Sequence, residues 1–415
     1  MKKSRGGHCP PAVNRKRCIN HSGEQCSPLQ TKTIFKSLNK KTISFLLMLS
    51  LLFCSVFPAF AVDDKAISAP SAVLMEAQTG KILYEKNAHE QRPCASVTKV
   101  MTLLLVFEAI DSGKLSLDTV ITTSEHAASM GGSDIWLEPN ETMTADDMIK
   151  ATVVASANDA AVALAEQISG SEEAFVNHMN DRAKQLKMND TVFKNCNGLD
   201  EDGHVTSAYD VAVMSRELTK HEKIFDYTSI WIDYLRGGKT QLVNTNKLLK
   251  TYKGITGLKT GTTDKAGCCI SATASRDGMS LIGVVLGCDN GKQRFADAAA
   301  LLDYGFANYS VKELSAPEDM PLSIDVENGM EESVDLDCDV NSGFVTGKAT
   351  SDEITSNVDL PESVEAPVKK GQVIGRLSFK SGDQKRDFDI TADSDVEEIT
   401  FGSVFETCLN SLFTI

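Results

Sequence analysis

Three short motifs in this 415-residue chain carry the groups needed for acyl transfer through a serine. In chain order they are Ser96-Val97-Thr98-Lys99, Ser156-Ala157-Asn158 and Lys259-Thr260-Gly261. A hydroxyl becomes a useful nucleophile only when a neighbouring group removes its proton, and the motifs supply two amines for that purpose. Each motif alone arises readily by chance, but the three in this order predict one composite site.

Ser96 and Lys99 are predicted to be the nucleophile and its base. After Pro93 the apolar residues follow a helical period, so we expect Ser96 at the start of a helix, with Lys99 one turn later on the same face. An amine with a pKa of about 10.4 accepts the proton only if its charge is disfavoured. Burial and a second cation, Lys259, would both lower that pKa, and the helix N-terminus would favour the developing alkoxide.

The other two motifs are expected to handle the leaving group and the substrate. Ser156 is expected to relay a proton to the leaving amine, and Asn158 to offer an amide donor and acceptor to a peptide backbone. The strand that carries Lys259, Thr260 and Gly261 is expected to pair with an extended substrate, since a glycine lets two backbones approach closely.

Backbone N–H groups are expected to stabilise the negative charge that develops during the reaction. The amides of Ser96 and Thr262 are predicted to form this oxyanion hole. A terminal carboxylate on the substrate needs cations or donors placed locally, and Lys259, Thr260 and Arg294 are the candidates.

Residues 1–61 have the features of an export leader. The pair Lys40-Lys41 precedes an apolar run over residues 43–57, and Ala59-Phe60-Ala61 follows as an expected cleavage site. Lipid attachment at Cys54 is a weaker alternative, because a bulky residue precedes it. We therefore expect an exported protein that acts in the cell wall or on the outer face of the cytoplasmic membrane.

The charge argues against nucleic-acid binding, and the spacing of the histidines and cysteines argues against a metal site. Residues 62–415 hold 32 Lys/Arg and 56 Asp/Glu, a formal charge of −24, so nucleic acid is not an expected partner. The histidines show no H-E-x-x-H motif and the cysteines no C-x-x-C, so neither a metal nor another cofactor is expected. The cysteines are expected to be buried apolar residues. His204 lies in a Gly-rich loop, which we expect it to order rather than to act as a base.

Hydrophobic periodicity predicts an α+β fold in two domains. The first, residues 62–309, is expected to combine an antiparallel sheet flanked by helices with a helical subdomain, and the second, residues 310–400, to be a small β-rich module. Strands are predicted over 72–77, 82–84, 257–262, 269–275 and 281–286, and helices over 97–113 and 294–304. Residues 144–186 are predicted to be helical in two amphipathic segments separated by Ser169-Gly170-Ser171. The tail, residues 401–415, has apolar residues at helical spacing.

At the three motifs the sequence resembles the D-alanyl-D-alanine carboxypeptidases among the low-molecular-mass penicillin-binding proteins. The likeness extends to residues 197–210 and to residues 366–375, the latter similar to the family's accessory β-domain. Two departures are Cys94, two residues before the nucleophile, and Ala157, where the family usually has glycine. The resemblance implies a β-lactamase/transpeptidase-like catalytic domain and a Ser96 acyl-enzyme that water hydrolyses. It also implies peptidoglycan stem peptides ending in D-Ala-D-Ala as substrates and β-lactams as covalent inhibitors.

Other functions remain to be weighed against this one. A class A β-lactamase would need its Glu-Pro segment after the second motif, whereas Glu138-Pro139 precedes Ser156. A non-catalytic wall-binding scaffold would not need an intact Ser96 and Lys99. The balance between carboxypeptidase and muropeptide endopeptidase activity stays open. The tail is either a peripheral membrane anchor, as in relatives, or a docked terminal helix, and its lack of Lys and Arg weakens the first interpretation.

Overall fold

The computed structural model describes residues 67–349, 353–382 and 384–405. The predicted leader lies outside these residues, and so does the tail beyond Phe405. Within the described ranges, no helix combines the length and the apolar character needed to cross a bilayer.

The centre of the catalytic region is a five-stranded antiparallel sheet in the order β2-β1-β9-β8-β7. Its strands are β1 (Ser71–Glu76), β2 (Ile82–Lys86), β7 (Ile255–Thr263), β8 (Gly267–Arg276) and β9 (Met279–Cys288). The predicted hairpin turn joins β8 to β9, and both Asp277 and Gly278 have positive φ there, as a two-residue turn requires. Strand β1 pairs with β9, so the first and the last strand of this sheet along the chain are neighbours in it.

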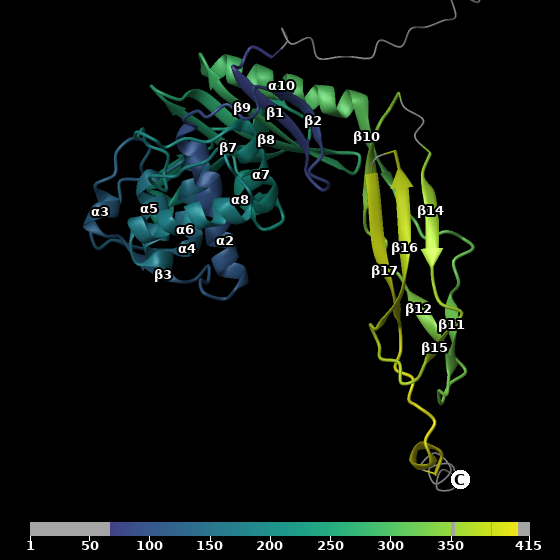
Figure 1. The fold of residues 1–415 in the computed structure, drawn as a ribbon. Helices are drawn as coiled ribbons and strands as arrows, with labels where there is room; N and C mark the ends of the chain where they lie inside the picture. The colour runs from purple at the N-terminus through teal and green to yellow at the C-terminus, as the bar shows by residue number, and fades with distance from the viewer. Residues whose placement is uncertain (1–66, 350–352, 383, 406–415) are drawn as a thin grey trace, which may run out of the picture. The chain divides into compact units, whose positions relative to one another are not determined.

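One face of this sheet is covered by helix α10 (Gly291–Asn308), as Figure 1 shows. Side chains alternate across a strand, so Ile270 and Ala272 of β8 pack toward α10 while Cys269 points to the opposite face. Asn290 caps the helix, accepting a hydrogen bond from the Gln293 N–H. The predicted helix over 294–304 is therefore confirmed and extended by a turn at its start.

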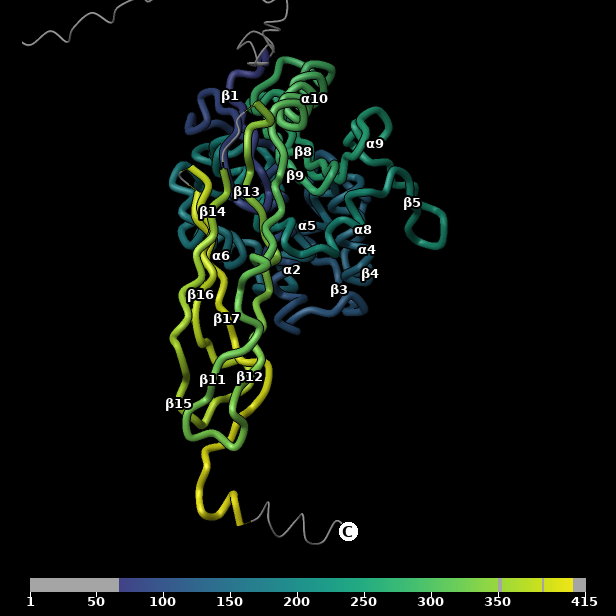
Figure 2. Tube along the Cα trace, turned by 90° about the vertical axis from the view of Figure 1, so that its right-hand side faces the viewer, coloured from purple at the N-terminus to yellow at the C-terminus, as the bar shows by residue number. Residues whose placement is uncertain are grey.

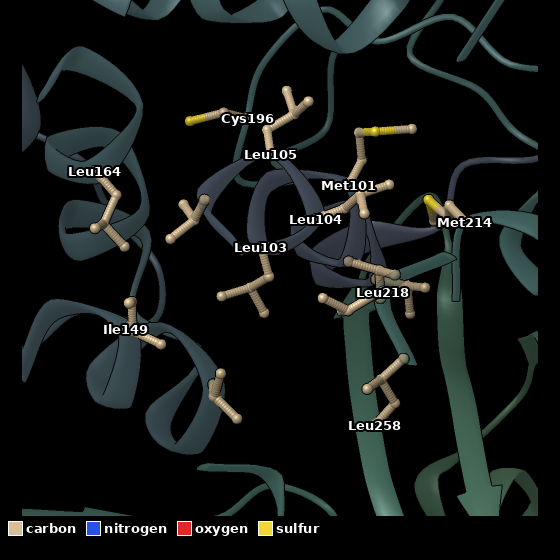
Figure 3. Close-up of a cluster of buried hydrophobic side chains, with 14 of the residues drawn as sticks. Met101, Leu103, Leu104, Leu105, Ile149, Leu164, Cys196, Met214, Leu218 and Leu258 are labelled. Atoms are coloured by element: carbon tan, nitrogen blue, oxygen red, sulfur yellow. The ribbon is translucent and has the colours of Figure 1, made fainter. Parts of the chain in front are cut away.

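The opposite face carries the helical block. Its long helices are α2 (Lys99–Asp111), α5 (Asn158–Ser169), α6 (Glu172–Gln185) and α7 (Ala208–Thr219), and its short ones are α3 (Glu125–Ala128), α4 (Ala145–Lys150) and α8 (Ile224–Thr228). The short helix α9 (Leu248–Thr251) lies outside this block, and its Leu248 packs in the cluster under α10. Most of α2 is buried, as expected of a helix that is apolar on all sides. Figure 3 shows Met101 and Leu104 of α2 packed among side chains of the surrounding elements, including Leu218 and Leu258.

Polar side chains set the starts of these helices. Thr144 accepts from the Asp147 N–H, as its predicted capping role requires, and Ser171 and Ser207 cap α6 and α7 in the same way. The predicted helical stretch over 144–186 is interrupted, however, by a π-helical turn, η2 (Ala151–Ala155), directly before the second motif.

Two small hairpins border the block. They pair β3 (Val120–Thr122) with β4 (Thr142–Thr144) and β5 (Ile232–Leu235) with β6 (Thr240–Val243), the latter joined by the short turn η3 (Arg236–Gly238).

The C-terminal region is β-rich, as predicted. Strands β10 (Tyr309–Glu313) and β13 (Gly343–Gly347) pair with each other. A six-stranded sheet in the order β14-β16-β17-β12-β11-β15 follows, in which β14, β16 and β17 run side by side (Figure 2). Its strands are β11 (Ser323–Glu327), β12 (Ser333–Asp337), β14 (Thr355–Asp359), β15 (Ser363–Glu365), β16 (Val373–Ser381) and β17 (Gln384–Ala392). An α+β catalytic region followed by an all-β module confirms the predicted fold class.

Candidate active site

Ser96 lies in a 3-10 turn, η1 (Ala95–Thr98), that leads directly into α2. The predicted helix therefore begins as a tighter turn, and its α-helical part starts at Lys99. Ala95 has a positive φ of 50°, a conformation that disfavours a residue with a Cβ. The turn is held against the neighbouring loop, because a Cβ on Gly198 would lie 2.0 Å from the Ala95 carbonyl oxygen.

Lys99 is fully buried, and its amine reaches the nucleophile. Its Nζ lies 3.0 Å from Ser96 Oγ, 2.5 Å from Asn158 Oδ1 and 2.7 Å from the Asn197 carbonyl oxygen. A neutral amine has two N–H groups and one lone pair. If both N–H groups donate to the two carbonyl oxygens, the lone pair is left for the Ser96 hydroxyl proton.

Burial lowers the pKa of Lys99 to about 7. Asp134, Asp159 and the neighbouring cysteines act in the opposite direction but are weaker. From the sequence, burial and the cation Lys259 were expected to lower the pKa of Lys99 together, whereas in the structure burial is the cause. The amine is therefore substantially unprotonated at neutral pH, as a general base must be.

The second motif begins with a left-handed residue. Ser156 has φ 63° and ψ 28° and follows the π-helical turn, while Ala157 has φ −58°. Alanine therefore fits without strain at the position where the resemblance implied glycine. Lys259 Nζ donates to Ser156 Oγ at 2.8 Å and to the Thr260 carbonyl oxygen at 3.0 Å, so this hydroxyl joins the second motif to the third.

Lys259 is as deeply buried as Lys99. Burial, followed by the charges of Lys99 and Arg294, holds the pKa of Lys259 well below its usual range. Two amines and a guanidinium thus lie near one another within a protein whose overall charge is strongly negative.

Strand β7 passes directly against the nucleophile turn. A Cβ on Gly261 would lie 2.7 Å from the Cys94 carbonyl oxygen and 2.8 Å from the Ser96 backbone nitrogen. Only glycine leaves room for this approach. The strand consequently runs beside the Ser96 N–H, where the sequence analysis expected the oxyanion hole.

Arg294 braces the end of β7 from α10. Its Nη1 donates to the Gly261 carbonyl oxygen at 2.9 Å, to Thr262 Oγ1 at 3.0 Å and to the Cys269 carbonyl oxygen at 3.3 Å. Thr262 is exposed, whereas Thr260 is buried and shares a hydrogen bond of 2.6 Å with Thr245 Oγ1. Part of the guanidinium that was expected to meet a substrate carboxylate is therefore engaged by the strand itself.

The loop before the second motif is fixed to it by hydrogen bonds. Asn158 donates through Nδ2 to the Gly131 carbonyl oxygen and through its backbone N–H to the Ser133 carbonyl oxygen, both at 2.6 Å. Asn158 was expected to offer its amide to a substrate, yet both ends of the amide contact the protein.

The same loop carries an exposed indole, Trp136. The buried carboxylate of Asp159 accepts the N–H groups of Ile135 and Leu137, and Arg236 donates to the carbonyls of Ile135 and Trp136. Trp136 itself is 80% exposed. The backbone on both sides of this side chain is therefore held in place although the side chain is not packed.

His204 organises the loop beside the nucleophile. The Lys194 N–H donates to His204 Nδ1 at 3.1 Å, so Nε2 carries the proton and donates to Thr98 Oγ1 at 2.8 Å. Thr98 in turn lies 3.3 Å from the sulfur of Cys94. Burial lowers the pKa of His204 to about 4 and raises that of Cys94 to about 11, so neither group is suited to act as a base or a nucleophile near neutral pH.

His204→Asn is expected to lower stability by about 1–3 kcal/mol through the loss of buried hydrogen bonds. Because the folded pKa of about 4 lies below the ordinary 6.5, the unfolded chain binds a proton between these values that the folded chain does not. The unfolding free energy should therefore fall as pH drops from about 6.5 to about 4, and this component should be absent from the variant. Urea unfolding at pH 7 and pH 4.5 measures both effects, and equal pH sensitivity of the two proteins would contradict the assignment.

The sequence did not indicate several of the groups that shape this site. The Asn197 carbonyl and Gly198 act through a backbone group and a close approach, for which the sequence has no pattern, and Thr245 acts through a hydroxyl that lies outside the three motifs. Among the described residues, no group of three or more His, Cys, Asp or Glu side chains is placed to hold a metal ion.

Known protein families match both the N-terminal region and the C-terminal β-rich region of this chain. The family model described as D-alanyl-D-alanine carboxypeptidase matches residues 58–290, and the one described as the C-terminal domain of penicillin-binding protein 5 matches residues 309–398. The chain is 41% identical over 373 residues to the D-alanyl-D-alanine carboxypeptidase DacF of Bacillus subtilis, covering 87% of this chain and 96% of the relative.

Solved structures agree with these matches. Penicillin-binding protein 5 of Haemophilus influenzae superposes with a TM-score of 0.64 at 30% identity, covering 80% of this chain and 98% of the other. Penicillin-binding protein D2 of Listeria monocytogenes in its ampicillin-bound form gives a TM-score of 0.51 at 35% identity, covering 58% of this chain and 98% of the other.

Proposed function

Because this chain belongs to the D-alanyl-D-alanine carboxypeptidase family, we propose that Ser96 attacks the terminal D-Ala-D-Ala bond of a peptidoglycan stem peptide. The observation that carries the proposal is the distance of 3.0 Å between Lys99 Nζ and Ser96 Oγ. A buried amine with a pKa of about 7 can take the hydroxyl proton as the Oγ–carbonyl bond forms.

The tetrahedral intermediate is stabilised by the N–H groups of Ser96 and Thr262. The close approach of β7 at Gly261 supports this role, because it holds the strand beside the Ser96 nitrogen. Collapse of the intermediate breaks the peptide bond, and the leaving D-alanine amine takes a proton from Ser156. Lys259, which donates to Ser156 Oγ, keeps that hydroxyl oriented and can restore its proton.

Hydrolysis completes the cycle. Lys99 first releases to solvent the proton that it took from Ser96. Water then attacks the Ser96 ester, Lys99 accepts the proton of that water and returns it to Ser96 Oγ, and the shortened peptide leaves with a new carboxylate. Asn158 acts in this scheme chiefly by positioning Lys99, because its Oδ1 accepts from Nζ.

Recognition of the substrate carboxylate is assigned to the end of the third motif. The Thr260 and Thr262 hydroxyls and the positive potential of Lys259 supply donors and charge, with Arg294 fixing the strand that presents them. β-Lactams would occupy the same place and acylate Ser96, and the Listeria relative has been solved in an ampicillin-bound form. We further propose that residues 1–61 direct export and that the C-terminal tail makes a peripheral membrane contact.

Mass spectrometry after incubation with benzylpenicillin tests the proposal. We expect one adduct on the peptide that contains Ser96 and none in Ser96→Ala, together with D-alanine release from a D-Ala-D-Ala peptide that this variant abolishes. An adduct at Cys94, or no adduct on folded protein, would reject Ser96 as nucleophile. Equal D-alanine release by both proteins would do the same, and binding without release by either would favour a scaffold role.

A further inference from the structure

Two cysteines face each other across neighbouring strands of the central sheet. Cys268 of β8 and Cys288 of β9 are direct partners in the antiparallel register, although they are 20 positions apart in the sequence. Directly opposed residues in such a pair have Cα atoms about 4.5–5.5 Å apart. Disulfides need Cα atoms about 4.4–6.8 Å apart, so the register alone brings these two into range.

Both side chains also lie on the same face of the sheet. Cys268 and Cys288 pack in the cluster under α10, whereas Cys269 belongs to the cluster on the opposite face. Burial, followed by the charge of Asp297, raises the pKa of Cys288 to about 12. The adjacent sulfur of Cys269 points away from this pair and serves as an internal comparison.

We propose that Cys268 and Cys288, which the structure holds as free thiols, form a disulfide-bonding pair in the exported protein. Exported proteins meet an oxidising environment, and the required oxidant is an organic disulfide, either a small molecule or a thiol oxidase. The pair carries no C-x-x-C signature, because the strand register rather than sequence proximity brings it together.

The reaction follows from the surroundings of each sulfur. Cys268 is partly exposed, so its thiolate attacks the oxidant disulfide, forming a mixed disulfide and releasing one thiol. Cys288 Sγ lies 3.9 Å from Asp297 Oδ2, and burial together with this carboxylate keeps Cys288 protonated until it reacts. Cys288 then attacks the Cys268 sulfur of the mixed disulfide, and the departing thiolate takes up the Cys288 proton as the second thiol. The two cysteines lose two protons and two electrons, and the oxidant disulfide is reduced to two thiols.

The bond would brace the strand that supplies the oxyanion hole. Thr262 of β7 is the register partner of Cys268, and its Oγ1 lies 3.7 Å from that sulfur. Thr262, Cys268 and Cys288 thus form one row across three strands. The effect on the oxyanion hole rests on the proposed role of Thr262. Formation of the disulfide between Cys268 and Cys288 does not depend on that role.

Differential alkylation of the mature, full-length protein tests the pair. The reduced protein is exposed to oxidised glutathione, free thiols are blocked with N-ethylmaleimide, and tryptic peptides are weighed. We expect residues 266–276 linked to residues 277–292, at 2 Da below the sum of the two reduced peptides plus one N-ethylmaleimide on Cys269. Because Cys268 and Cys269 share a peptide, the link should persist in Cys269→Ala and disappear in Cys268→Ala.

A second measurement remains informative if a variant folds poorly. Reduction of the wild-type protein should lower its Tm by roughly 5 °C, while the Tm of Cys288→Ala should not respond. Any of three results would overturn the proposal. These are alkylation of both thiols after oxidation, a stable glutathione adduct on Cys268, and a link that needs Cys269. Penicillin labelling of Ser96 in the same samples reports on the proposed function separately.

Discussion

Lys99→Met is expected to slow acylation of Ser96 by about 10³-fold. Methionine fills a similar volume but cannot accept the hydroxyl proton, so the nucleophile keeps its ordinary, weakly reactive form. The measurement is the second-order rate of labelling by a fluorescent penicillin. The matched control is Lys184→Met, because Lys184 is an exposed lysine paired only with Asp181 on the surface. A rate within threefold of wild type for Lys99→Met would remove Lys99 from the role of base.

The same rate should depend on pH in a defined direction. Only the neutral amine accepts a proton, and the pKa of Lys99 is lowered to about 7. Acylation should therefore fall about tenfold for each pH unit below 7 and level off above it. The acidic limb of this pH–rate profile should keep its position in His204→Asn, because the His204 imidazole stays neutral down to about pH 4. A rate that rises toward pH 5 would contradict this assignment.

Gly261→Ala is expected to reduce acylation by about 10²-fold or more. The new Cβ would meet three backbone atoms at 2.7–2.9 Å, on Cys94, Ser96 and Val97, and backbone cannot yield as a flexible side chain does. The strand must move away from the Ser96 N–H, which misplaces the oxyanion donors.

Gly283→Ala on β9 is the control for this substitution. The nearest atoms to a Cβ at Gly283 lie 3.6 Å away on Leu302, which is ordinary contact. Labelling rates and Tm measured on both variants separate a local effect at the site from general destabilisation. Near-normal labelling of Gly261→Ala would show that the approach of β7 is not needed for catalysis.

Local signals in the sequence predicted the elements of the site well. The cap at Thr144, the Asp277-Gly278 turn and the apolar period after Pro93 each act within a few residues, and the structure contains all three. The pairing of Lys99 with Ser96 follows in the same way, because one helical turn fixes it. The predicted fold class and family are likewise confirmed.

The sequence did not indicate which residues far apart in the chain lie close together in the structure. The strand order joins β1 to β9 across about 200 residues, and no local pattern encodes that register. The left-handed Ser156 follows a π-helical turn in a stretch with an ordinary helical period. The carbonyl of Asn197 holds Lys99 through a backbone atom that every residue has, so its residue type gives no hint of the contact.

The exposed indole beside the second motif gives this protein a built-in optical probe. The chain has two tryptophans, and one of them, Trp231, lies under the ammonium of Lys250 with 4.3 Å between Nζ and the ring centroid. The other, Trp136, is largely in solvent on a loop whose backbone is fastened to the segment that holds Asn158. Emission from Trp136 should therefore report movement of this loop when a ligand binds, without any added label.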